Sequence, residues 1–142
     1  MTLPVPLLLT HAAATLAMAG LAWFVQVVHY PLFARVGEAG FAAYEMEHQR
    51  RTGLVVIPAM LTEAACAAAL LWLAPGDPRV VAGAALLAAI WASTFLLQVP
   101  LHARLERGFD AAAQRRLVAT SWIRTLAWTA RGGIALALLA GG

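Results

Sequence analysis

Four apolar stretches, each about as long as a bilayer is thick, constrain this chain more than any other feature. A helix needs roughly 20 mostly apolar residues to cross the hydrocarbon core of a membrane. The stretches occupy residues 7–29, 53–73, 80–101 and 117–139. They use up most of the 142 residues, so little chain is left for a second unit. We therefore expect one all-α domain over residues 1–142, folded as an integral membrane four-helix bundle.

Composition agrees with a membrane location and argues against a nucleic-acid partner. The chain is 62% hydrophobic and only 12% charged, whereas about a quarter of the residues of a soluble domain are charged. The net charge of +3 comes from arginine, because the sequence has no lysine. These arginines lie mostly at the ends of the apolar stretches, which is typical of membrane proteins. No basic residue precedes the first stretch, so we expect no cleavable signal peptide.

A short phrase occurs twice in the chain. Residues 31–36 read Pro-Leu-Phe-Ala-Arg-Val and residues 100–105 read Pro-Leu-His-Ala-Arg-Leu. Each copy closes an apolar stretch, and each is followed by Gly-Phe and then by Gln-Arg-Arg. A signature repeated at matching places indicates two similar halves. The sequence thus predicts a bundle built from two repeated helical hairpins.

The connections after the first and third stretches are long, and their pattern is helical. Phe41, Tyr44 and His48 share one helical face, and residues 102–109 show the same spacing. We expect both connections to form amphipathic interfacial helices. The middle link, residues 74–78, is rich in helix breakers and predicts a tight turn.

The arginines also predict an orientation. The long connections hold most of them: Arg35, Arg50, Arg51, Arg104, Arg107, Arg115 and Arg116. Positively charged loops stay in the cytoplasm. We therefore expect a multi-pass protein of the cell inner membrane, with its long connections inside and both termini outside. Abundant alanine allows close helix approach and is compatible with a homo-oligomer.

Polar residues inside the spans point to a site. An ionisable group at membrane depth costs about 2.5–3.5 kcal/mol on insertion scales. The polar residues in or beside the spans are Gln26, His29, Glu45, His48, Glu63, Gln98, His102, Arg124 and Arg131. At 1.5 Å per residue, most of them fall in the cytoplasmic leaflet. Such convergence predicts that they jointly bind something.

A metal centre is one interpretation of this cluster. Glu45 and His48 have the Glu-x-x-His spacing that helix bundles use to hold metals. With His29 and His102 they could hold one divalent ion (Fe, Zn, Mn or Cu) and leave a position open. Haem held by axial imidazoles is an alternative. Structural roles are the alternative. His29 and His102 would then be interfacial residues at helix ends, and Glu63 would form a structural ion pair with Arg131. Arg124 would extend its side chain toward the lipid headgroups.

The remaining polar and aromatic residues suggest further roles. We expect Glu63 to accept a proton and Arg124 to bind an anionic or carbonyl oxygen of a substrate. Gln26 and Gln98 would orient metal ligands. Tyr44, Trp122 and Trp128 would lie near the substrate, although packing is the simpler role for tryptophan. A site at this depth predicts a lipophilic small molecule that enters from the membrane lipid.

Two segments resemble a known family. Residues 98–105 (Gln-Val-Pro-Leu-His-Ala-Arg-Leu) and 121–128 (Ser-Trp-Ile-Arg-Thr-Leu-Ala-Trp) resemble the anthrone-oxygenase-like family of small four-helix membrane proteins. The matching positions are Pro100, Arg104, Leu105, Arg124 and Thr125. Most members of that family have no assigned activity, but a few oxidise anthrones with oxygen. Residues 41–60 bear a weaker similarity to the haem-binding four-helix protoporphyrinogen oxidase of bacteria.

Taken together, these features predict a metal-dependent membrane oxidoreductase, an oxygenase or oxidase acting on a lipophilic substrate. A non-catalytic membrane subunit or a small transporter is the alternative from another class, with the polar cluster as a binding or packing site. A haem-binding oxidase is a second alternative.

Overall fold

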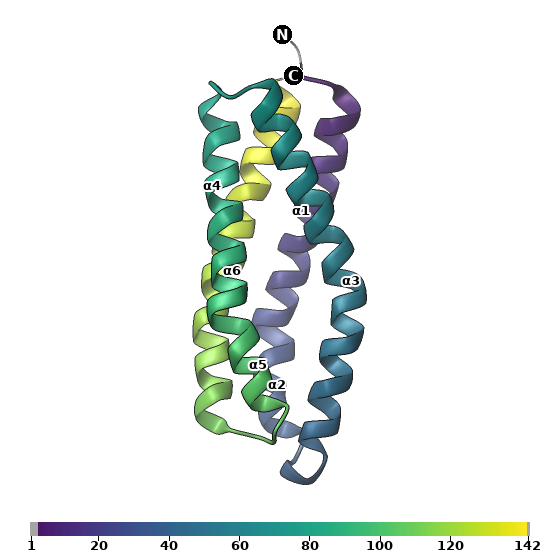
Figure 1. Cartoon of the computed structure of the whole chain (residues 1–142), viewed down its shortest axis with the longest axis vertical. Coiled ribbons are helices and arrows are strands. Elements are labelled where there is room, and N and C mark those ends of the chain that lie inside the picture. The colour runs from purple at the N-terminus through teal and green to yellow at the C-terminus, as the bar shows by residue number, and fades with distance from the viewer. Residues whose placement is uncertain (1–2, 142) are drawn as a thin grey trace.

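The computed structural model describes residues 3–141, which form four long helices lying side by side (Figure 1). Short π-helical or 3-10 segments divide two of them. In chain order the elements are α1 (Val5–Phe24), η1 (Val25–His29), α2 (Tyr30–Leu32), η2 (Phe33–Arg35), α3 (Glu38–Leu73), α4 (Pro78–Ser93), η3 (Thr94–Gln98), α5 (Val99–Leu105) and α6 (Ala111–Ala140). We call the end of the bundle with both chain termini the terminal end, and the opposite end, with residues 36–37 and 106–110, the connection end.

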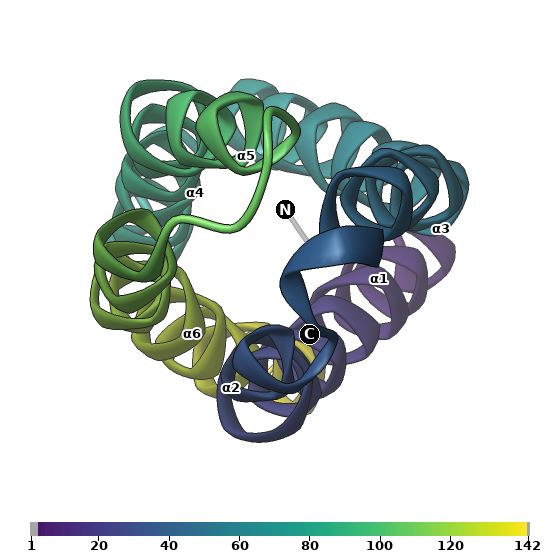
Figure 2. The same ribbon diagram turned by 90° about the horizontal axis from the view of Figure 1, so that it is seen from below.

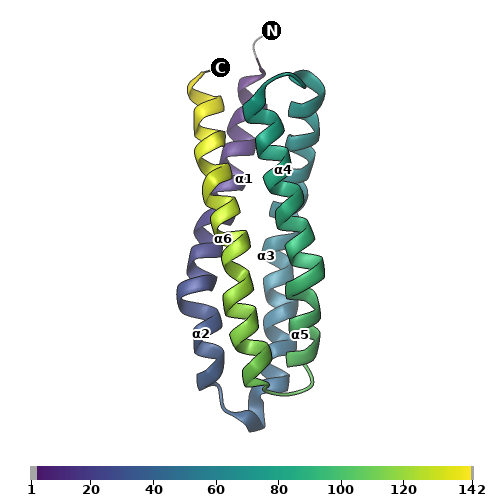
Figure 3. The same cartoon turned by 90° about the vertical axis from the view of Figure 1, so that its left-hand side faces the viewer.

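Three of these helices are long and apolar enough to cross a membrane, within the residues that the structure describes. They run over Val5–Arg35, Glu38–Leu73 and Pro78–Leu105. The 30-residue α6 lies beside them along the bundle (Figure 3), but four arginines lower its hydropathy. The predicted all-helical, membrane-compatible fold is confirmed at this level, and a fourth crossing by α6 stays a prediction.

The structure differs from the expectation of separate interfacial helices. Residues 31–35 continue the first long helix, residues 38–52 are the first part of α3, and α5 continues the third long helix. Gly37 explains the difference at the first connection. Its φ of 88° lets the chain reverse within two residues, so α3 begins immediately and its helical pattern lengthens a long helix. Gly108, with φ 138°, has the equivalent place before α6.

A π-helical segment precedes a proline in both halves of the chain. The segments η1 and η3 each end two residues before a proline, Pro31 and Pro100 respectively. Proline lacks an N–H, and its ring clashes with the carbonyl four residues earlier. The wider π turn makes room for that ring, and such segments often mark functional sites. The shared feature fits the predicted repeat, although the two hairpins as repeated units stay a prediction.

The core consists of three apolar clusters stacked along the bundle. The cluster at the connection end includes Phe33, Phe41, Leu105 and Leu117. Met18, Met60, Ile90 and Trp128 belong to the middle cluster, and Leu8, Leu70, Val80 and Leu138 form the cluster at the terminal end. Large apolar side chains also face outward, among them Leu54, Val55 and Leu96. An apolar exterior over an apolar core is what a bilayer-embedded bundle requires.

Asp110 fixes the start of α6. Its carboxylate accepts hydrogen bonds from the backbone N–H groups of Ala112 (2.9 Å) and Ala113 (3.0 Å), and its other oxygen lies 2.5 Å from Arg104. These N–H groups have no partner within the helix, so the carboxylate satisfies them. The Ala113 N–H, followed by Arg104, holds the pKa of Asp110 below its ordinary value of 3.8.

We predict that Asp110→Ala lowers the melting temperature of the detergent-solubilised protein by a few degrees, and that Asp110→Asn loses less, because an amide oxygen still caps the helix. The folded pKa is depressed, so the charge contributes stability above pH 3.8 and loses that contribution as the pH falls through the folded value. Thermal scans of the three proteins from pH 7 to pH 3 test this. Equal melting temperatures at pH 7 would contradict it.

Candidate functional site

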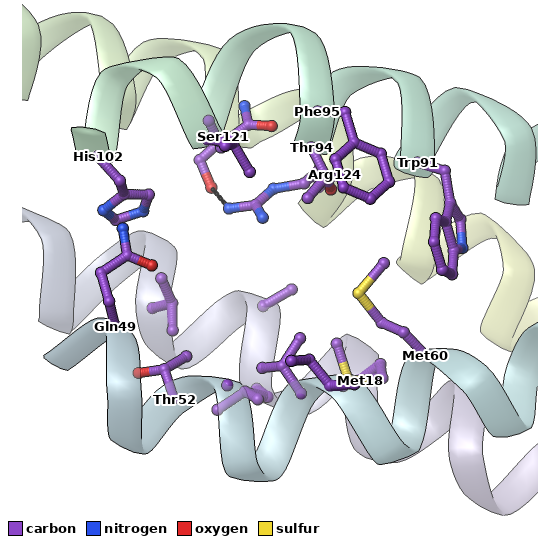
Figure 4. Close-up of a pocket in the computed structure, with 18 of the residues that line it drawn as sticks. Met18, Gln49, Thr52, Met60, Trp91, Thr94, Phe95, His102, Ser121 and Arg124 are labelled. Atoms are coloured by element: carbon purple, nitrogen blue, oxygen red, sulfur yellow. Dashed lines mark hydrogen bonds between the residues drawn. The ribbon is translucent and has the colours of Figure 1, made fainter. Parts of the chain in front are cut away.

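A cavity of about 480 Å³ lies between the four long helices (Figure 4). Most of its wall is apolar, with Met18, Val56 and Met60 among the lining residues. Its polar lining residues include Tyr30, His48, Gln49, Thr52, Gln98, His102, Ser121 and Arg124. In Figure 4, His102 and Gln49 mark one end of the cavity and Trp91 the other. The cavity therefore suits an amphiphile with an apolar body and a polar group.

The cavity opens sideways, through the flank of the bundle. Four of its lining residues have strongly exposed side chains: Ile57 (58%) and Leu61 (56%) on α3, and Phe95 (56%) and Val99 (49%) on the third long helix. These residues place the mouth of the cavity between α3 and the adjoining segments η3 and α5. All four are apolar, so the rim of the mouth is apolar. Viewed from the connection end, α3 and α5 occupy neighbouring corners of the bundle (Figure 2). A molecule dissolved in a bilayer could enter there without passing through water.

A hydrogen-bonded chain of four side chains, one from each long helix, crosses the bundle at the polar end of the cavity. The Glu45 carboxylate on α3 lies 2.5 Å from Nδ1 of His102 on α5. Nε2 of that imidazole lies 3.0 Å from the hydroxyl of Tyr30 on α2. Arg124 on α6 donates from Nη2 to the same hydroxyl (3.2 Å) and to Ser121 Oγ (3.2 Å). Tyr30, His102 and Arg124 line the cavity, and the fully buried Glu45 lies behind them.

The hydrogen bonds of this chain fit a neutral His102 that is protonated at Nδ1. An ionised Glu45 can only accept, so Nδ1 of His102 donates to it. Nε2 then accepts from the Tyr30 hydroxyl, whose oxygen accepts from Arg124. Tyr30 is thus linked to a basic nitrogen and a guanidinium at once. This arrangement suits a phenol that gives up and regains a proton.

The four predicted metal ligands lie together but bind one another in pairs. His29 Nε2 is 2.9 Å from His48 Nδ1, and Thr52 Oγ1 is 3.1 Å from the same nitrogen. His102 uses one nitrogen for Glu45 and the other for Tyr30. Within residues 3–141, no three His, Cys, Asp or Glu side chains are placed to hold a metal ion.

The predicted orienting and substrate-side residues divide into two groups. Gln98 and Trp128 line the cavity. Gln26, although buried, instead donates to the Val118 carbonyl (3.0 Å). Tyr44 stacks on His48 with ring centroids 6.5 Å apart. Trp122 packs edge-on against Trp23 near the surface and is 40% exposed.

Glu63 does not join the site. Its carboxylate accepts hydrogen bonds from Trp128 Nε1 (2.9 Å) and from Arg131 Nη2 (3.3 Å), and both charged side chains are at most 1% exposed. Arg131 also donates to the Gly83 carbonyl and lies 3.5 Å from Nε2 of His11. The structural ion pair with Arg131, which the sequence left open, is therefore present. Glu63 lies behind Trp128, outside the cavity wall.

Sequence reasoning missed Tyr30, which the structure places at the centre of the hydrogen-bonded chain. It also missed Gln49, Thr52 and Ser121 on the cavity wall. Tyr30 stands between His29 and Pro31 and is spaced i, i+4 from Gln26, so a helical-face argument could have found it. Ser121 and Thr52 carry no such signal, because hydroxyl side chains are common in membrane helices.

No protein-family model, no curated protein and no solved structure matches the chain. The proposed function therefore rests on the geometry of the cavity and its polar residues.

The Glu63–Arg131 pair yields a prediction about stability. Removing one partner leaves the other charged and buried, which costs about 3–5 kcal/mol, whereas replacing both with apolar residues is often neutral. We therefore expect Arg131→Met to reduce stability far more than the double variant Glu63→Leu/Arg131→Met does. Denaturant titrations of these two variants, of Glu63→Leu and of the wild-type protein form a double-mutant cycle. Additive losses would show that the two side chains do not interact.

Proposed function

We propose that this protein binds a lipophilic molecule from the bilayer and moves a proton to or from an oxygen, or a carbon next to a carbonyl, of that molecule. The observation that supports this best is the Glu45–His102–Tyr30–Arg124 chain in the wall of a laterally open apolar cavity. Placing two charges and an imidazole inside the bundle of a membrane protein is costly. Such residues in a spanning bundle mark a functional site by default.

Tyr30 is the residue proposed to exchange the proton with the ligand. When its hydroxyl passes its proton to Nε2 of His102, the oxygen left behind is stabilised by Arg124 at 3.2 Å. Glu45 fixes the imidazole orientation and balances the charge that forms on it. The Tyr30 oxygen then removes a proton from a phenol or from a carbon next to a carbonyl. In the reverse direction the ligand regains a proton from Tyr30, and His102 returns its Nε2 proton to the Tyr30 oxygen.

Oxidation is the reaction class that we propose for this proton transfer. The resemblance to anthrone oxygenases implies an aromatic ketone with an acidic C–H group. Removing that proton gives an oxyanion, which Arg124 is placed to stabilise, and oxygen then oxidises the anion to a quinone with release of water. This reaction needs a base, a cation and an apolar cavity. Tyr30 and Arg124 would supply the base and the cation at the polar end of the cavity, and most of the cavity wall is apolar.

The donor set does not favour a metal in this step. His29 and His48 offer two nitrogens, whereas catalytic zinc sites use three protein ligands. Recruiting His102 would break its bond to either Glu45 or Tyr30. A bound metal or haem therefore stays a prediction from sequence, which elemental analysis and a visible spectrum of the purified protein would test.

A second candidate, a small transporter, receives less support from the far half of the bundle. A transporter needs a path from the cavity to the other membrane face. Toward the terminal end the interior is filled by the Leu8–Leu70–Val80–Leu138 cluster and by the Glu63–Arg131 pair. The cavity beside Arg131 is only about 10 Å³, which is room for about one water. A binding site with chemistry at one level of the membrane agrees better than a transporter with this filled interior at the terminal end.

The proposed setting is the inner membrane, with α6 as a fourth crossing and the connection end in the cytoplasm. The exposed arginines at the connection end include Arg35, Arg107, Arg115 and Arg116, and positive charge is retained on the cytoplasmic side. Both termini lie at the opposite end (Figure 1), so they would face outward.

Substitutions in the hydrogen-bonded chain test the proposed function. With anthrone as substrate, in proteoliposomes, we expect wild-type protein to accelerate oxygen uptake. Tyr30→Phe and His102→Gln should lower that acceleration about 100-fold or more, the usual contribution of a general acid or base. Tyr44→Phe is the matched comparison, because Tyr44 lies outside the cavity wall, and it should retain most of the activity. Full activity in properly folded Tyr30→Phe protein would contradict the mechanism.

A further inference from the structure

We propose that Gln49 is a specificity-determining residue of the cavity, whose amide oxygen accepts a hydrogen bond from an O–H or N–H group of the ligand. This inference rests on the proposed function, because it names a feature of the molecule that the same cavity takes. Gln49 neither gives up nor takes up a proton, so it selects the ligand and has no part in the chemistry.

The orientation of the Gln49 amide follows from its neighbour Glu45. Nε2 of Gln49 lies 3.4 Å from Oε1 of Glu45, one turn earlier on α3. An ionised carboxylate can only accept hydrogen bonds, so the NH2 group of the amide has to face it. The flipped amide would place the Gln49 oxygen against the carboxylate, and two acceptors repel each other. The amide oxygen of Gln49 is therefore turned away from Glu45.

This oxygen is open to the cavity. Gln49 lines the cavity and is half-buried, and Figure 4 shows its amide oxygen directed into the space between the helices. In the part of the chain that the structure describes, the Gln49 side chain forms one hydrogen bond, which is the contact of its nitrogen with Glu45. Unlike the unpartnered Nε of Arg124 and Nε1 of Trp91, the Gln49 oxygen is not enclosed by protein atoms. A ligand in the cavity can therefore reach it.

The other amide on the cavity wall, Gln98, is engaged at both ends. Its oxygen accepts from Ser93 Oγ (3.1 Å), and its nitrogen donates to Thr120 Oγ1 (3.2 Å). Gln49 differs because its oxygen has no such partner. A ligand that enters the cavity displaces water from this oxygen, and an acceptor left without a hydrogen bond is costly. The cavity therefore favours a ligand that brings a donor to Gln49 over one of the same shape without a donor.

The place of Gln49 beside the hydrogen-bonded chain indicates the form of the ligand. Through Glu45, Gln49 is linked to the Nδ1 side of the His102 ring, whereas Tyr30 lies on the Nε2 side. The oxygen or carbon that exchanges a proton with Tyr30 and the group that donates to Gln49 are therefore set apart on the ligand. The structure thus suits an aromatic ketone or phenol that carries a second, donating group away from its reacting atom.

A matched pair of tricyclic probes tests the donor. 2-(Hydroxymethyl)anthraquinone carries an O–H group, and 2-ethylanthraquinone has a methyl group in place of that hydroxyl. Binding to the protein in lipid nanodiscs is measured by quenching of tryptophan fluorescence and by equilibrium dialysis. Each affinity is corrected for partition of the probe into protein-free nanodiscs. The variant is Gln49→Met, which keeps the length of the side chain, and Arg50→Met is the control, because Arg50 is exposed and lies outside the cavity wall.

We expect wild-type protein and Arg50→Met to bind the hydroxymethyl probe about 3- to 10-fold more tightly than the ethyl probe, the usual worth of one hydrogen bond. Gln49→Met should bring the ratio of the two affinities close to one. Because Gln49 also donates to Glu45, its loss could disturb the site as a whole, but that disturbance would weaken both probes alike and leave the ratio unchanged. Gln49→Leu provides the same comparison if Gln49→Met does not fold.

The outcomes distinguish this inference from the proposed function. Equal, saturable binding of the two probes to wild-type protein would overturn the role of Gln49 and leave a lipophilic binding site in place. A preference for the hydroxymethyl probe that persists in Gln49→Met would also overturn it, because another group would then accept the hydrogen bond. Failure of both probes to bind would overturn the inference and the proposed binding function together.

Discussion

The short contact between the Glu45 carboxylate and the His102 imidazole ties the second long helix to the third at the polar end of the cavity. A bilayer offers no water to either group, so each has to find its partner inside the bundle. The contact turns Nε2 of His102 toward Tyr30, and Tyr30 in turn meets Arg124. One buried pair thereby sets the orientation of the groups that face the cavity. The proposed chemistry depends on that orientation.

The two buried polar clusters of this bundle differ in their access to the cavity. Glu63 has both oxygens occupied, by Trp128 and Arg131, and neither charged residue lines the large cavity. The chain from Glu45 to Arg124 instead places Tyr30, His102 and Arg124 on the cavity wall. A pair without access to the cavity holds helices together, whereas the residues on the wall can contact a ligand. Trp128 separates the two clusters, since it lines the cavity and also donates to Glu63.

Much of the fold could be predicted from the sequence, because spans of about 20 apolar residues leave few options. The polar level of His29, His48 and His102 also followed from counting 1.5 Å per residue. The helical periodicity of residues 38–52 did not reveal whether they lie along the membrane surface or lengthen α3. They lengthen α3 because Gly37, with its positive φ, allows the chain to reverse immediately before them.

The partners inside the site were harder to predict than its level. Depth along a helix says nothing about rotation, so Gln26 and Gln98 looked alike although only Gln98 reaches the cavity. Glu-x-x-His spacing suggested that Glu45 and His48 share one ligand, yet Glu45 binds His102 and His48 binds His29. Tyr30 was missed because a tyrosine near a membrane surface is ordinarily an anchor. Its role depends on Arg124, 94 residues further along the chain.

The central claim, that Glu45 orients His102 toward Tyr30, is tested most directly by ¹⁵N solid-state NMR of histidine-labelled protein in bilayers. A His102→Gln sample identifies the His102 signals by their absence. We predict that Nδ1 carries the proton shared with Glu45 and that Nε2 is unprotonated and hydrogen-bonded, with a shift that moves in Tyr30→Phe protein. A ring protonated at Nε2 alone, or a His102 spectrum unaffected by both Glu45→Gln and Tyr30→Phe, would contradict the account.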